Sequence, residues 1–93
     1  MCRKLTVKFM PPLSSTIGTK IVETEVSSDT TVKEILVKIN MLLGGKLPLN
    51  SSGVMEPGYI VMLDGVDIRV KSGYNTRVDD HKELIIIPVS HGG

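Results

Sequence analysis

The chain has 93 residues, of which 41% are hydrophobic and 23% charged, as expected for one folded globular domain rather than a disordered or collagen-like chain. The formal net charge is +1 and no basic stripe is visible, which disfavours direct binding to nucleic acid. Cys2 is the only cysteine, which excludes an internal disulfide, and no apolar run approaches the ~18 residues of a membrane helix, so we expect a cytoplasmic protein without a membrane contact.

The first two elements are predicted to be strands. Residues 4–10 alternate between apolar and polar side chains, and residues 20–26 do the same. Alternation with a period of two is typical of a half-buried strand. Residues 14–19, SSTIGT, are turn formers, so we expect the two strands to pair as a hairpin.

An amphipathic helix follows. Thr31 and Glu34 have the spacing of a capping box, and Gly44-Gly45 can close the other end in the left-handed conformation. The apolar residues between these ends recur at three and four positions, which predicts about three turns with one buried stripe. The predicted stripe comprises Val32, Ile35, Leu36, Ile39, Leu42 and Leu43.

The second half of the chain is predicted to hold three strands. Residues 46–58 are rich in Gly, Pro, Ser and Asn and form an irregular connection. Residues 59–70, YIVMLDGVDIRV, predict a hairpin around Asp64-Gly65, with its second strand over 66–70. Residues 71–82 form a polar loop with one helical turn. The last run, ELIIIPV, is continuously apolar, which favours a central strand covered on both faces.

This order predicts an α+β fold in which one main helix lies across a mixed sheet of about five strands. We expect a single domain over residues 1–89 and a flexible, projecting tail over residues 90–93.

The polar residues give little sign of catalysis. Asp79, Asp80 and His81 are contiguous, so they cannot converge on a metal ion without distant help, and a solvated turn is the better interpretation. Asp64 and Asp67 flank a hairpin turn and are expected to be structural. We therefore expect no enzyme active site, no metal and no intrinsic cofactor.

The C-terminal group offers a different chemistry. A carboxylate joined to AMP becomes an acyl-adenylate, which reacts with a persulfide, thiol or amine. Gly92 and Gly93 lack Cβ atoms, so such an end can thread a narrow channel and leaves its carboxylate accessible.

The element order with a Gly-Gly end resembles the β-grasp of ubiquitin-like proteins, and SSDTTVKEIL resembles a ubiquitin-type helix entry. EPGYIVMLDGVDI, a polar loop, an apolar final strand and HGG are together similar to the ubiquitin-related modifier family. That family is related to the MoaD and ThiS sulfur carriers for molybdopterin and thiamin and to the small archaeal modifiers. Pro57-Gly58, the turn from Asp64 to Asp67, and His91-Gly92-Gly93 carry the resemblance.

The resemblance implies that an E1-like enzyme adenylates Gly93 with ATP bound by that enzyme, and that a sulfur-transfer protein helps to form a thiocarboxylate. The product would serve tRNA thiolation or join lysines of target proteins. It also implies partner contacts by His91 and Ile87, although Ile87 could equally be plain core. The alternatives are the small subunit of molybdopterin synthase, which acts with a larger subunit, and a β-grasp interaction module whose glycines do no chemistry.

Overall fold

A computed structural model describes residues 3–78 and 81–89 of the chain. It has the predicted α+β architecture, with a five-stranded sheet and one long helix. In chain order the elements are β1 (Arg3–Phe9), α1 (Leu13–Ile17), β2 (Ile21–Val26), α2 (Val32–Leu42), β3 (Tyr59–Leu63), β4 (Val66–Asp67), two 3-10 helices (Ile68–Val70 and Gly73–Asn75) and β5 (Glu83–Pro88).

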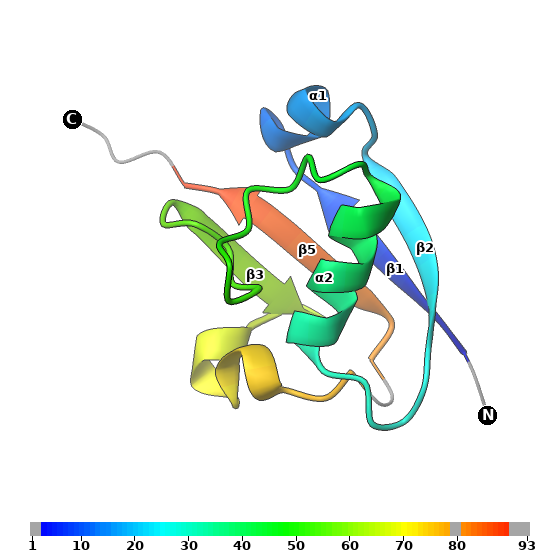
Figure 1. The fold of residues 1–93 in the computed structure, drawn as a ribbon. Coiled ribbons are helices and arrows are strands. Elements are labelled where there is room, and N and C mark those ends of the chain that lie inside the picture. Colours follow the sequence, from blue (N-terminus) through cyan, green and yellow to red (C-terminus); the bar gives the residue numbers. More distant parts are fainter. Residues whose placement is uncertain (1–2, 79–80, 90–93) are drawn as a thin grey trace.

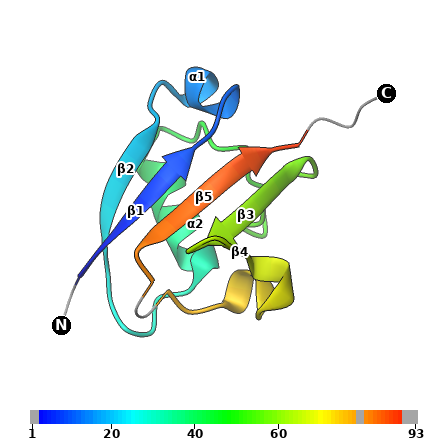
Figure 2. The same cartoon turned by 180° about the vertical axis from the view of Figure 1, so that it is seen from behind.

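The sheet is mixed and has the strand order β2-β1-β5-β3-β4 (Figure 1; β4 is labelled in Figure 2). β1 and β2 are antiparallel, as the predicted hairpin requires, and β5 lies between β1 and β3. β5 is parallel to β1 and antiparallel to β3. The prediction that the last apolar run is the central strand is therefore confirmed.

Helix α2 packs across one face of the sheet and closes the core (Figure 1). Val32, Ile35, Leu36 and Ile39 are at most 1% exposed, and burial of each such side chain contributes about 1.5–3 kcal/mol. Leu42, predicted on the same stripe, is 64% exposed, because the helix ends there. Leu43, which follows the helix, packs against the core. Gly44 and Gly45 then turn the chain away in the left-handed conformation, with φ values of 67° and 79°.

The start of α2 is fixed by the capping box that the sequence predicts. The Thr31 Oγ1 accepts a hydrogen bond from the Glu34 backbone N–H at 3.3 Å, and the Glu34 Oε1 accepts one from the Thr31 N–H at 3.0 Å. Two backbone donors that the first helical turn leaves unpaired are thus satisfied by side chains.

We expect Thr31→Ala to lower the free energy of unfolding by about 1 kcal/mol, because it removes the cap acceptor without touching the core. Urea denaturation measures the change. Ser28→Ala, at an exposed position in the preceding turn, is the control and should leave the midpoint nearly unchanged. Equal effects of the two substitutions would contradict this role of Thr31.

Two elements differ from the prediction. The first is the turn predicted over residues 14–19, where Leu13–Ile17 form the short helix α1, which Gly18 ends with a φ of 83°. Leu13 and Ile17 are both buried, so one turn of helix lets both side chains reach the core. A spacing of four between apolar residues before a glycine is the signal that could have found α1.

The second strand of the β3–β4 hairpin is shorter than expected. β4 spans only Val66–Asp67, and residues 68–70 form a 3-10 helix instead. The Asp67 Oδ1 accepts a hydrogen bond from the Arg69 N–H at 2.8 Å, which turns the chain out of the ladder. An Asp side chain that bonds the backbone two residues on is a turn signal that overrides the apolar alternation.

The expectation that β5 is covered on both faces is wrong. Leu84 and Ile86 are fully buried under α2, whereas Ile85 and Ile87 on the other face are only half-buried. No helix lies over that other face in the part of the chain that the structure describes (Figure 2). We call it the open face.

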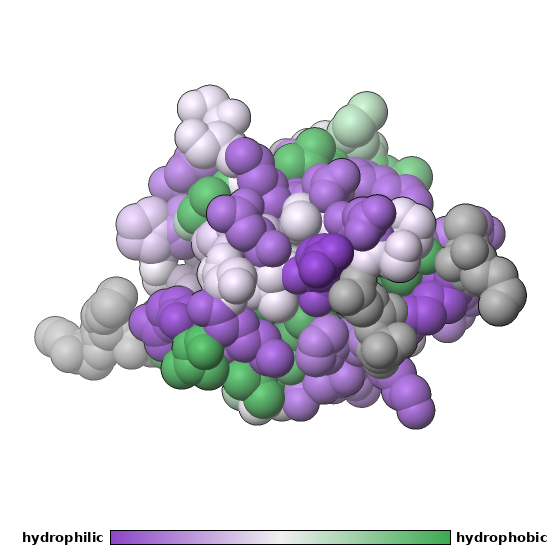
Figure 3. Space-filling view, turned by 90° about the horizontal axis from the view of Figure 1, so that it is seen from below, coloured by the Kyte–Doolittle hydropathy of each residue, from purple (hydrophilic) through white to green (hydrophobic). Residues whose placement is uncertain are grey.

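The end of the molecule with the β2–α2 loop and the 3-10 helices is mostly hydrophilic in the view from below (Figure 3). An ion pair between Arg77 Nη1 and Asp29 Oδ1, 3.2 Å apart, lies on this surface. No helix among the described residues is long and apolar enough to span a bilayer.

Candidate functional site

The open face carries an apolar patch where β3 and β5 lie side by side. Ile60 is the register partner of Ile87, and Met62 is the partner of Ile85, so the four side chains form two adjacent cross-strand pairs. All four are half-buried. We call Ile60, Met62, Ile85 and Ile87 the open-face patch. Half-buried apolar pairs on an otherwise uncovered sheet face are suited to contact another protein.

A charged pair borders the open-face patch on its β1 side. Lys8 is the register partner of Ile85 across the parallel β1–β5 pair, and its Nζ lies 2.6 Å from the Glu83 Oε2. Both side chains are partly exposed, so the pair contributes at most about 1 kcal/mol to stability. Its charges give the apolar surface a polar rim, as in protein interfaces.

The C-terminal end of β5 is anchored from both neighbouring strands. The Met10 N–H donates to the Ile86 carbonyl at 3.1 Å, and the Val89 N–H donates to the Gly58 carbonyl at 2.8 Å. The chain is therefore held as far as Val89, two residues beyond Ile87. The predicted site residues His91, Gly92 and Gly93 lie outside the described residues, as does Cys2.

The N-terminal end of β5 is anchored by Asp64, for which the sequence indicates only a place in a turn. Its Oδ1 accepts hydrogen bonds from the backbone N–H groups of Lys82 and Glu83 at 3.1 and 2.9 Å, and its Oδ2 lies 3.1 Å from the His81 Nδ1. Asp64 has a φ of 49°, a left-handed conformation that Asp and Asn tolerate better than most residues. The β3–β4 turn is thus tied to the strand that carries Ile87.

These contacts affect the ionisation of Asp64. Desolvation opposes the charged form, but the hydrogen bonds from Lys82, Glu83 and His81 outweigh it and hold the pKa of the Asp64 carboxyl below its usual range. A lowered folded-state pKa contributes stability above the unfolded-state pKa of about 4, and this stability is lost as the pH falls through the folded value.

We therefore expect Asp64→Asn to lower the free energy of unfolding at pH 7 by roughly 1 kcal/mol, a value discounted for the partial exposure of the group. The deficit should shrink at pH 3, below the unfolded-state pKa of about 4, because the carboxyl of the unfolded native chain is then largely protonated and the stability that the lowered folded-state pKa contributes is fading. Urea denaturation at both pH values tests this, with Glu56→Gln, at an exposed side chain, as the control. A deficit that stays constant with pH would contradict the assignment.

Of the other acidic candidates, the structure describes Asp67, which makes only a local ion pair. Asp67 pairs with the neighbouring Arg69, whose Nη2 lies 2.7 Å from the Asp67 Oδ2. This pairing, with the Arg69 backbone N–H, lowers the pKa of Asp67. Asp79 and Asp80 lie outside the described residues. Within the described ranges, no three His, Cys, Asp or Glu side chains are grouped so that they could hold a metal ion.

No family model matches the sequence, and no curated protein matches it. Solved structures do resemble it. Urm1 from Sulfolobus solfataricus is 26% identical, covers 90% of this chain and 99% of its own, and superposes with a TM-score of 0.67. CysO, solved in complex with BexX from Amycolatopsis orientalis, is 25% identical over 96% of this chain and 99% of that one, with a TM-score of 0.70.

The small archaeal modifier protein 1 from Methanosarcina acetivorans is more distant in sequence, with 18% identity, but has a TM-score of 0.77 over 100% of this chain and 99% of its own. These neighbours are small ubiquitin-like carriers and modifiers, which are not themselves enzymes. Together with the strand order and the single long helix, these similarities show that the chain has the ubiquitin-like β-grasp fold that these small sulfur carriers and modifiers share.

Proposed function

We propose that the chain is a sulfur carrier and protein modifier that works through the carboxylate of Gly93. An E1-like enzyme with its own ATP adenylates this carboxylate and releases diphosphate. The outer sulfur of a persulfide on a sulfur-transfer protein then displaces AMP and gives an acyl disulfide. A second thiol of the partner attacks the sulfur that belongs to the transfer protein, which forms a protein disulfide and releases the thiocarboxylate on Gly93. This thiocarboxylate supplies tRNA thiolation. The adenylated or thiolated end also reacts with lysines of target proteins. Because the activation consumes ATP, we assign it to the cytoplasm.

One observation carries the proposal: β5 contributes Ile85 and Ile87 to the open-face patch and is also the strand that leads into the Gly-Gly end. Ile87 contributes to the patch, and β5 stays anchored to Val89, only four residues from Gly93. A partner that binds the patch is therefore within reach of the terminal carboxylate, since four extended residues span about 13–14 Å. We propose that Ile87 docks on the activating enzyme and that His91 contacts it beside the channel.

Intact mass spectrometry tests the chemistry directly. The full chain is incubated with ATP, a sulfur donor and the E1-like enzyme of its own host. We expect a mass increase of about 16 Da, because sulfur replaces one carboxylate oxygen. An unchanged mass, with an enzyme that activates its own known carrier, would refute the sulfur-carrier function. The alternative, a β-grasp interaction module whose glycines do no chemistry, would then be favoured.

The recipient of the sulfur is tested separately. Deletion of the gene in its host should lower the content of thiolated tRNA nucleosides and abolish conjugates detected with an antibody to the chain. Loss of molybdopterin alone, with tRNA thiolation intact, would instead support the small subunit of molybdopterin synthase.

A further inference from the structure

Strand β2 forms an edge of the sheet, on the side away from β3 and β4. In the described part of the sheet it pairs only with β1. The Phe9 N–H donates to the Lys20 carbonyl at 2.9 Å, so the backbone groups of Lys20 face β1. In an antiparallel pair the backbone N–H and C=O groups of successive residues face alternately toward the partner strand and away from it. The backbone groups of Val22 and Thr24 therefore face β1, and those of Ile21, Glu23 and Glu25 face outward.

Two of the three outward carbonyls are already occupied by side chains of the protein. The Thr19 hydroxyl donates to the Ile21 carbonyl at 3.1 Å, and the Lys38 Nζ donates to the Glu25 carbonyl at 3.1 Å. The carbonyl and N–H of Glu23 remain directed outward between these two caps. Capping by side chains shortens the part of an edge strand that can pair with another chain.

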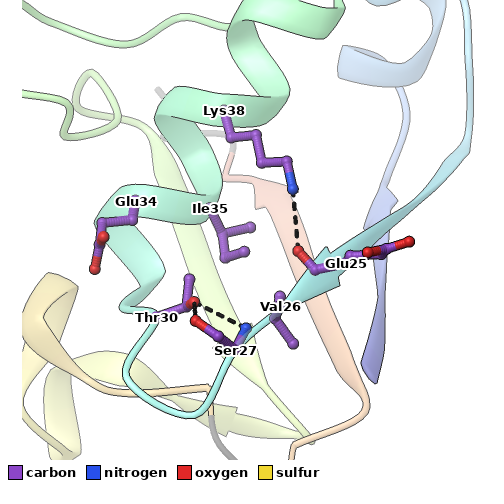
Figure 4. A pocket seen from close by; sticks show the side chains of 7 residues that line it. All are labelled: Glu25, Val26, Ser27, Thr30, Glu34, Ile35 and Lys38. Atoms are coloured by element: carbon purple, nitrogen blue, oxygen red, sulfur yellow. Dashed lines mark hydrogen bonds between the residues drawn. The ribbon is translucent and has the colours of Figure 1, made fainter. Parts of the chain in front are cut away.

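A groove lies at the C-terminal end of this edge, between β2 and α2, and Glu25 and Val26 are the β2 residues that line it. It has a volume of about 390 Å³, and Val26 and Ile35 form its apolar wall (Figure 4). Thr30 and Ser27 line its lower end, and Lys38 reaches down across it from α2 to the β2 backbone (Figure 4). The groove therefore lies beside the free edge, where alternate side chains of an added strand would enter it.

The carboxylates on the outer edge of β2 determine which kind of strand can pair with it. Glu23 and Glu25 are exposed and point to the open face. Antiparallel pairing of two copies about Glu23 would set Glu23 opposite itself and Ile21 opposite Glu25, so like charges would meet. Like charges directly opposite each other destabilise a strand pair, whereas opposite charges stabilise it. A second copy is therefore disfavoured and a basic strand favoured.

We propose that the β2 edge binds an extended basic segment of a partner protein as a sixth strand. Lysines or arginines at every second position of that segment lie opposite Glu23 and Glu25. Small apolar residues at the positions between them enter the groove against Val26 and Ile35. β1 separates this edge from β5, so a partner can occupy it while the open-face patch stays accessible.

The probe is the peptide acetyl-Lys-Val-Lys-Val-Lys-Val-amide, titrated into the full 15N-labelled chain. We expect chemical-shift changes confined to residues 21–26 and to Ile35 and Lys38. Hydrogen exchange of the outward Glu23 N–H should slow at least about tenfold at saturation, because that group becomes paired. The Glu-Val-Glu-Val-Glu-Val analogue should bind at least about tenfold more weakly.

Two variants separate strand addition from simple charge attraction. The double substitution Glu23→Lys with Glu25→Lys should reverse the preference to the glutamate peptide. In an antiparallel pairing the lysine residues opposite Glu23 and Glu25 turn their N–H groups toward β2, so N-methylation of the central lysine amides should abolish binding of the lysine peptide to the native chain. Equal binding of both peptides, retention of binding after N-methylation, or shifts on the open-face patch would overturn the proposal. Concentration-dependent shifts at Glu23 without peptide would show self-pairing and would overturn it too.

Discussion

Deletion of Gly93 is expected to lower the rate of thiocarboxylate formation at least about a thousandfold. The shortened chain still ends in a glycine carboxylate, so the reacting group is unchanged. Its position is not, because the end is withdrawn by one residue, roughly 3.5 Å. A misplacement of about 1 Å can already cost a hundredfold in rate when two reacting groups must be aligned.

The rate is measured by intact mass after incubation with ATP, the sulfur donor and the E1-like enzyme. Gly93→Ala is the informative companion, because it keeps the length and adds one Cβ; we expect an intermediate loss. Ser90→Ala is the control and should react as the native chain does. Full activity of the chain without Gly93 would refute the assignment of this carboxylate as the working group.

The same deletion should leave the folded domain unaffected. Val89 is the last residue with a described backbone anchor, and the core lies between β5, β1, β3 and α2. We therefore expect the urea midpoint to match that of the native chain. A lowered midpoint would mean that the loss of reaction reflects unfolding.

The helix and the strand order were predictable because local signals agreed with the packing. Thr31 and Glu34 bond each other's backbone as their spacing indicates, and Val32, Ile35, Leu36 and Ile39 all face the core. β5 was predictable as the central strand from its β-branched run. Short-range pattern and tertiary burial coincide at these positions, as they do in foldable sequences.

Which face of β5 is buried under α2, and which is left open, was not predictable from the apolar run ELIIIPV. Alternation between two faces is invisible in a stretch where every residue is apolar, so the sequence cannot distinguish Leu84 and Ile86, under α2, from Ile85 and Ile87, on the open face. The role of Asp64 was hidden for another reason. Its hydrogen bonds reach residues 17 to 19 positions away, and no local pattern encodes such a contact.

Ile87→Glu is expected to weaken binding to the E1-like enzyme at least about 30-fold, or ~2 kcal/mol, the size of an interface hot spot. Ile87 lies on the open face beside its register partner Ile60, so a carboxylate there can still reach water in the free chain. In the complex with the enzyme this carboxylate would be desolvated without a hydrogen-bond or ion-pair partner, and this desolvation lowers the binding affinity.

Met41→Glu is the matched control for this substitution. Met41 is 78% exposed at the end of α2, on the other side of the sheet, so the variant gains the same charge without altering the open-face patch. Titration calorimetry with the E1-like enzyme should give native affinity for Met41→Glu and a weak or undetectable signal for Ile87→Glu. Ile60→Glu should behave like Ile87→Glu, since the two side chains form one cross-strand pair. If Ile87→Glu binds as tightly as Met41→Glu while both remain folded, the activating enzyme does not dock on the open-face patch.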